Sequence, residues 1–139
     1  MSTALDLARQ SADAMWKDDA ASQSLGMKLV DVAPGMAQLS MTITKEMVNG
    51  HGTAHGGFIF TLADSAFAFA CNSYNERAVA AHCSISYIRP GKMGKQLIAT
   101  AREVSRSGRS GIYDVEIMQD HDVIAQFRGH SRLIGGSVF

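Results

Sequence analysis

The chain has 139 residues, of which 46% are hydrophobic and 19% are charged. This composition is typical of one folded domain over residues 1–139 and excludes a largely disordered chain. Thirteen basic and thirteen acidic residues give a net charge of zero, so we expect no nucleic acid and no membrane surface as partner. Residues 77–139 carry nine basic and five acidic residues. This local excess suits a ligand with phosphates, although a mixed solvated surface explains it equally well.

The cysteines and the apolar segments indicate the compartment. Cys71 and Cys83 lie in apolar surroundings and form no CxxC pair, which is typical of reduced, buried thiols. The first residues lack the basic and apolar regions of a signal peptide. The longest apolar stretch, Phe58–Cys71, is interrupted by Asp64 and is too short to cross a membrane. We therefore expect a cytoplasmic protein.

The first third of the chain predicts a helix and a hairpin. Residues 3–17 place apolar side chains at helical spacing, with Ser2 or Thr3 as the N-cap. Residues 27–33 and 36–43 predict two strands joined across Pro34-Gly35, because apolar and polar residues alternate in the second run.

The remaining elements predict a sheet around a central helix. Residues 45–54 form a loop rich in Gly and Asn, and residues 56–75 predict a helix that is apolar almost all round. Four strand patterns follow, over 79–89, 95–106, 111–119 and 122–133. Their short connections favour antiparallel pairing. The order α-β-β-α-β-β-β-β predicts an α+β fold in which an antiparallel sheet wraps around one long central helix. The open strand edges predict dimers or tetramers.

Asp64 is the candidate acid–base residue. It is the only acidic residue between Glu46 and Glu76 and lies in the middle of the apolar helix. Burying an unpaired carboxylate costs on the order of several kcal/mol, and desolvation raises its pKa toward that of a general base. The structural alternative is a carboxylate that hydrogen-bonds a neighbouring hydroxyl, such as Ser65 or Thr61.

The sequence His55-Gly56-Gly57 marks the start of the same helix. The first N–H groups of a helix lack internal partners and carry the positive end of the helix dipole. Glycine lets a substrate approach the backbone closely. These features suit an oxyanion hole, although a turn that simply requires glycine is the alternative.

The spacing between these two features has a geometric consequence. Gly56 and Asp64 are eight residues apart, which is about 12 Å along a helix. This is too far for both to act on one reacting carbon. If both act on the same substrate, two subunits must contribute, with their central helices related by a two-fold axis.

Asn49 precedes the helix in the run VNGHGTAHGG. Its amide suits a contact to water or a substrate carbonyl, and an Asn-Gly turn is the alternative. His51 and His55 have the spacing of a metal pair, but the run HGTAH lacks the glutamate of a zinc-peptidase motif, so we expect no metal. Patterns of a serine nucleophile or a phosphate loop are absent from the sequence.

Basic residues flank the turns of the second half. Arg89, Lys92 and Lys95 frame one turn, Arg106 and Arg109 frame another, and Arg132 follows near the end of the chain. If the strands pair in chain order, these turns converge at one end of the sheet, where they suit phosphates. Individually, each is also explained as a solvated side chain.

The run NGHGTAHGGFIFTLADSAFAFACNS, followed by SYIRPGKMGKQLIATA and GIYDVEI, resembles the hotdog-fold acyl-CoA thioesterases. The similarity is to their phenylacetate-degradation subfamily, called PaaI, and extends from Met15 to Gly136. The HGG start with an acid eight residues after its first glycine is the most specific part of the pattern.

The resemblance implies hydrolysis of acyl-CoA thioesters, with aryl-acyl groups such as phenylacetyl or hydroxyphenylacetyl. It implies that Asn49, His55 and the N–H of Gly56 come from one subunit, and that Asp64 of its neighbour acts as base or nucleophile. It also implies a homotetramer of two dimers without metal or cofactor. The residues expected to contact substrate or coenzyme A are Gly57, Ser65, Tyr87, Arg89, Lys92, Arg106, Gly108, Arg109 and Arg132.

Three details stay open at this point. Some relatives hold the water with a strand Ser or Thr, whereas the corresponding position here is near Ala80, so that contact is absent or supplied by Ser65. Phe58, Phe60 and Phe67 suit either an aromatic pocket or the core. The alternative functions are an acyl-CoA hydratase or dehydratase, a non-catalytic acyl-CoA-binding module, and a structural oligomer without a ligand.

Overall fold

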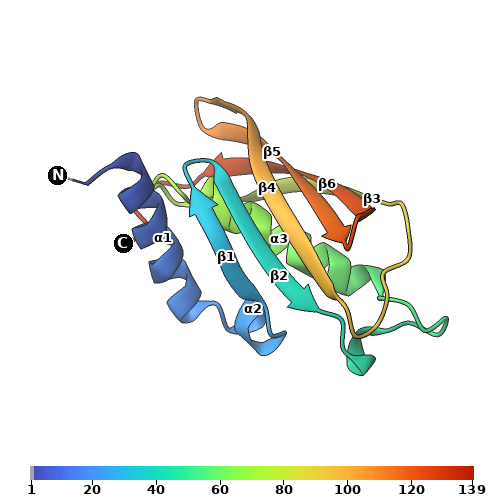
Figure 1. The fold of residues 1–139 in the computed structure, drawn as a ribbon. Coiled ribbons are helices and arrows are strands. Elements are labelled where there is room, and N and C mark those ends of the chain that lie inside the picture. The colour runs from blue at the N-terminus through green and yellow to red at the C-terminus, as the bar shows by residue number, and fades with distance from the viewer. Residues whose placement is uncertain (1) are drawn as a thin grey trace.

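Six antiparallel strands form one curved sheet around helix α3 in the computed structural model, which describes residues 2–139 (Figure 1). The strand order is β1-β2-β4-β5-β6-β3. This is the α+β hotdog arrangement expected from the sequence. In chain order the elements are α1 (Ala4–Asp18), α2 (Ala20–Ser24), β1 (Lys28–Ala33), β2 (Met36–Thr42), η1 (Lys45–Met47), α3 (Gly56–Cys71), β3 (Ala78–Tyr87), β4 (Gln96–Ser107), β5 (Ser110–Gln119) and β6 (Asp122–Leu133).

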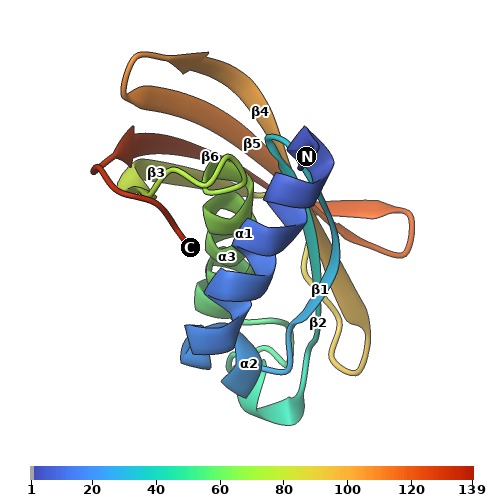
Figure 2. The ribbon, with the colours of Figure 1, turned by 90° about the vertical axis from the view of Figure 1, so that its left-hand side faces the viewer.

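Helix α1 confirms the first predicted helix and packs beside α3 (Figure 2). Thr3 and Asp6 form a capping box at its N-terminus, which satisfies two otherwise unpaired N–H groups. Trp16 contacts Phe69 of α3, with ring centroids 6.1 Å apart. The short helix α2 was not predicted. Asp19 caps it through the N–H of Ser22, a local bond that hydrophobic periodicity does not report.

Helix α3 occupies the concave side of the sheet, as expected for a helix that is apolar almost all round. It ends at Cys71, four residues before the predicted end. The reason is Asn72, whose side-chain amide donates to the carbonyls of Ala68 and Ala78 and accepts from the N–H of Ala78. These bonds turn the chain directly into β3.

The strands do not all pair in chain order. The expected convergence of the basic turns had assumed that order. Strand β3 pairs with β6, whereas β4 lies between β2 and β5. The connection after β3 therefore crosses the end of the sheet. Strand β3 forms one edge, and no strand among residues 2–139 pairs with its outer side. Most of its residues are exposed, including Val79 and Tyr87.

The core lies between α3 and the concave face of the sheet. Phe67 of α3 is buried against Phe127 and Tyr113. Gly129 of β6 makes room for this ring, because a Cβ at position 129 would lie 2.7 Å from Phe67. No helix within residues 2–139 combines the length and the apolar character needed to cross a membrane.

Candidate active site

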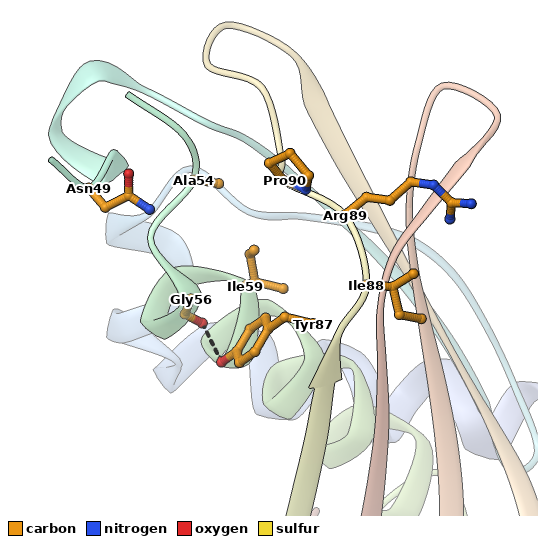
Figure 3. Close-up of a pocket in the computed structure, with 8 residues that line it drawn as sticks. All are labelled: Asn49, Ala54, Gly56, Ile59, Tyr87, Ile88, Arg89 and Pro90. Carbon is orange, nitrogen blue, oxygen red and sulfur yellow. Dashed lines mark hydrogen bonds between the residues drawn. The ribbon is translucent and has the colours of Figure 1, made fainter. Parts of the chain in front are cut away.

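An open pocket of about 370 Å³ lies at the N-terminus of α3, between the preceding loop and the end of β3 (Figure 3). It is lined by Asn49, Ala54, Gly56, Ile59, Tyr87, Ile88, Arg89 and Pro90. The structure thus brings together four predicted site residues from two segments that are far apart in the sequence.

The N–H of Gly56 is the open hydrogen-bond donor of this helix end. Gly57 donates to Nδ1 of His55 at 2.9 Å, and Phe58 and Ile59 donate to the carbonyl of His55 at 3.0 and 3.4 Å. Among residues 2–139, no acceptor bonds the N–H of Gly56. One donor therefore remains at the positive end of the helix dipole, on a residue that lines the pocket.

His55 is the N-cap of α3 and is exposed. Because its Nδ1 accepts from Gly57, the proton of the neutral ring is assigned to Nε2, which is left as a donor. Within the described part of the chain, no three His, Cys, Asp or Glu side chains gather as ligands.

Asn49 organises the loop that leads to α3. Its side-chain oxygen accepts from the N–H groups of His51 and Thr53, at 2.9 and 3.2 Å, and its amide nitrogen donates to Thr53 Oγ1. This is the turn role that the sequence left as the alternative. The amide nitrogen also points toward the pocket (Figure 3), so one N–H of the group remains for a ligand. Thr53 was missed by sequence reasoning, although its i+4 spacing from Asn49 is a local signal.

Asp64 is half-buried near the middle of α3. Burial raises the pKa of its carboxyl above the usual 3.8. The two hydroxyls that the sequence offered as its partners form hydrogen bonds to other groups. Thr61 donates to the carbonyl of Gly57 at 2.8 Å, and Ser65 hydrogen-bonds Ser22 at 2.8 Å. The structure therefore favours a desolvated base over a hydroxyl-bonded carboxylate.

The surroundings of Asp64 show which way it faces. Burial raises the pKa of Cys83 on β3, and the negative charge of Asp64 raises it further. Cys71 has a pKa raised to about 12, chiefly by burial and also by the same charge. Asp64 therefore lies near Cys83 of the edge strand β3 and near Cys71 of its own helix. Its separation from Gly56 along α3 is about 12 Å, so the two do not share one reacting atom within a subunit.

The predicted coenzyme A residues separate into two groups, which corrects the expected convergence. Arg89 and Lys92 lie in the connection before β4, whereas Arg106, Gly108, Arg109 and Arg132 lie at its other end, near the β4–β5 turn. Twelve residues of β4 separate the groups, a distance of about 36 Å. The two turns flank the same strand, β4, so they lie at opposite ends of the sheet whichever strand β3 pairs with.

Several of these cations have partners within the chain. Arg106 forms an ion pair with Glu76 at 3.2 Å and lies 3.5 Å from the centroid of the Tyr74 ring. Arg89 donates to the carbonyl of Val123 at 3.1 Å. Lys95 pairs with Asp120.

The phenylalanines of α3 have different roles. Phe67 belongs to the core, and Phe60 packs edge-on against Phe127 at 5.4 Å. Phe58 instead lines a second, more apolar cavity of about 460 Å³ with Leu25 and Met47. The prediction of an aromatic pocket therefore stays open only for Phe58.

Comparison with known proteins identifies the family. Residues 51–125 match the family described as the thioesterase superfamily. The acyl-coenzyme A thioesterase PaaI of Escherichia coli is 45% identical over 93% of each chain. Its structure superposes with a TM-score of 0.95 and 43% identity over 97% of this chain and 99% of that chain.

Two further structures are similar. A mutant of the phenylacetic acid degradation protein PaaI from Thermus thermophilus is 39% identical, with a TM-score of 0.79 over 81% of this chain and 97% of that chain. The smu.793 protein of Streptococcus mutans, bound to acetyl CoA, is 26% identical, with a TM-score of 0.77 over 80% and 90%. The resemblance inferred from the HGG-to-Asp pattern is confirmed, and this chain belongs to the thioesterase superfamily, among the hotdog-fold enzymes that include PaaI.

Proposed function

We propose that this thioester hydrolase cleaves acyl-CoA thioesters, and that its preferred substrates carry aryl-acyl groups such as phenylacetyl or hydroxyphenylacetyl. The observation that carries the proposal is the open N–H of Gly56 on the same helix as a desolvated, unpaired Asp64. Support for the substrate comes from relatives named as a coenzyme A thioesterase and as a phenylacetic acid degradation protein. A similar protein also has acetyl CoA bound.

The proposed site is shared between two subunits. The exposed edge strand β3 is suited to antiparallel pairing with a second copy about a two-fold axis. Such pairing places the end of one β3 beside the start of the other. Arg89 of one subunit then approaches the Arg106 and Arg132 end of its neighbour, which would restore a basic surface for the phosphates of coenzyme A. A tetramer would join two such dimers.

In the proposed reaction, Asn49, His55 and Gly56 of one subunit hold the thioester carbonyl. Water attacks the carbonyl carbon while Asp64 of the partner subunit takes its proton. The N–H of Gly56 donates a hydrogen bond to the oxygen and stabilises the negative charge that develops on it. The C–S bond then breaks, and the proton passes from Asp64 to the leaving thiolate. In the nucleophilic variant, the Asp64 carboxylate attacks the carbonyl carbon, and the C–S bond breaks as the thiolate leaves. Water then cleaves the resulting anhydride, which releases the free acid and restores Asp64, and the proton that water loses passes to the thiolate. Neither route uses a metal or a cofactor, and both suit a cytoplasmic enzyme.

The test is release of the coenzyme A thiol from a panel of aliphatic and aryl acyl-CoAs by the parent and by Asp64→Asn. We expect the highest kcat/KM with aryl-acyl groups. The substitution should lower kcat by about 10²–10⁴-fold while substrate binding is largely kept. Equal rates for both proteins would remove Asp64 from the mechanism. Hydration of an enoyl-CoA without thiol release, or binding without turnover, would contradict the proposed function.

A further inference from the structure

Tyr87 contacts the peptide group between Gly56 and Gly57, which follows the N–H proposed as the oxyanion donor. Its hydroxyl donates to the carbonyl oxygen of Gly56 at 2.9 Å (Figure 3). Its ring lies against the same residue, because a Cβ at position 56 would be 3.0 Å from Cζ and 3.1 Å from the hydroxyl oxygen. Tyr87 therefore occupies the space that any side chain at position 56 would need.

The peptide group between Gly56 and Gly57 is held at both ends. Tyr87 bonds its carbonyl, and Nδ1 of His55 bonds its N–H at 2.9 Å. The preceding peptide carries the open N–H of Gly56, and its carbonyl accepts from Phe58 and Ile59. Both peptide planes next to the Gly56 Cα are thus fixed, and the open N–H has a defined direction.

Two consecutive glycines make such a support necessary. Glycine has the largest backbone freedom and is a poor helix former, so the first turn of α3 has little intrinsic rigidity. Tyr87 supplies an anchor from outside the helix. It is the last residue of β3, where it pairs with the buried Ala125 of β6. The sheet therefore fixes the position of the hydroxyl.

We propose that Tyr87 is a positioning residue for the oxyanion donor: its hydroxyl and ring hold the first turn of α3 so that the N–H of Gly56 points at the developing negative charge. This inference rests on the proposed function. The hydroxyl proton of Tyr87 is donated to Gly56, and the expected contact of Tyr87 with the substrate stays a separate prediction.

The first test compares Tyr87→Phe with the matched control Tyr74→Phe. Both substitutions remove one hydroxyl that donates at 2.9 Å, but Tyr74 bonds Glu103 away from the site. We expect Tyr87→Phe to lower kcat by about 5–50-fold, because a misdirected donor stabilises the transition state poorly. KM should change less than about twofold, and Tyr74→Phe should keep the parent kcat. A parental kcat for Tyr87→Phe, or a loss confined to KM, would overturn the proposal.

The second test does not depend on turnover. Amide hydrogen exchange of residues 55–60 should be faster in Tyr87→Phe than in the parent and in Tyr74→Phe, with the oligomeric state checked by size-exclusion chromatography. If the parent releases no thiol from any acyl-CoA, the proposed function fails while the exchange result still reports on the positioning role. Unchanged exchange in this segment would show that Tyr87 does not hold the turn.

A double substitution separates the ring contact from general destabilisation. Gly56→Ala introduces a Cβ against Tyr87, so it should lower Tm less when Tyr87 is also replaced by Ala. Additive changes in Tm would mean that the two residues do not constrain each other and would count against the proposal.

Discussion

At the scale of single residues, the site depends on two groups that folding leaves without partners. Burial raises the pKa of Asp64, and the N–H of Gly56 has no acceptor among residues 2–139. Both groups lie on α3, and the proposed function depends on both of them. Each of them leads to a separate prediction.

The raised pKa of Asp64 predicts where the acidic limb of the pH–activity profile lies. The base must be ionised, so activity should rise as the pH passes through the raised pKa of the carboxyl. The limb of kcat/KM should therefore lie above the usual Asp value of 3.8. Measurement of kcat/KM between pH 4 and 9 checks this, and the residual activity of Asp64→Asn should lack the limb. A limb at or below 3.8 in the parent would show that burial does not tune this group.

The N–H donor of Gly56 can be removed by substitution with proline. Proline lacks an N–H and is tolerated at the first position of a helix. The φ of −65° and ψ of 131° at His55 are compatible with a following proline. Gly56→Ala is the matched control, because it adds the same Cβ against Tyr87 but keeps the N–H. We expect kcat of the proline variant to be about 10²–10³-fold below that of the alanine variant. Equal kcat values would exclude the N–H as the oxyanion donor.

At the scale of elements, the fit between α3 and the sheet sets where these groups lie. Gly129→Ala would place a methyl group 2.7 Å from the Phe67 ring, so Phe67 and α3 must shift. Overpacking of this kind costs about 1–3 kcal/mol, and we expect Tm to fall by roughly 3–10 °C in thermal unfolding. Gly50→Ala is the control, because no atom lies within 4 Å of its Cβ position. An unchanged Tm for Gly129→Ala would mean that the contact between α3 and the sheet rearranges to accept the methyl group without loss of stability.

The elements also show what the sequence could and could not predict. Strand and helix periods are local, so α1, α3 and all six strands were expected close to their observed bounds. The pairing of β3 with β6 is a long-range choice that turn lengths do not encode. The separation of Arg89 from Arg106 follows instead from the length of β4 between them. The bond from Tyr87 to Gly56 joins residues 31 positions apart, and no local pattern predicts it. Asp64 and Gly56 could be proposed as site residues because a lone acid and paired glycines stand out in an apolar helix, and their catalytic roles stay predictions.

At the scale of the whole molecule, the spacing of Gly56 and Asp64 along α3 bears on how many subunits the proposed active site needs. The two residues are about 12 Å apart along the helix, and Asp64 lies close enough to Cys83 of the exposed edge strand β3 to raise the pKa of that thiol. In the proposed function, the single chain carries two half-sites rather than one complete site. This proposal accounts for the ten-residue edge strand β3, whose outer side has no strand partner among residues 2–139.

A shared site predicts complementation between inactive variants. Asp64→Asn and Gly56→Pro each inactivate both sites of their own dimer, but a mixed dimer places both defects in one site and leaves the other intact. Random reassortment makes half of the dimers mixed, so we expect about a quarter of the parental activity after the two variants are unfolded and refolded together. Refolding each variant alone is the control and should give no recovery. Absence of recovery in the mixture, with mixed dimers demonstrated by native mass spectrometry, would mean that each active site takes Asp64 and Gly56 from the same subunit.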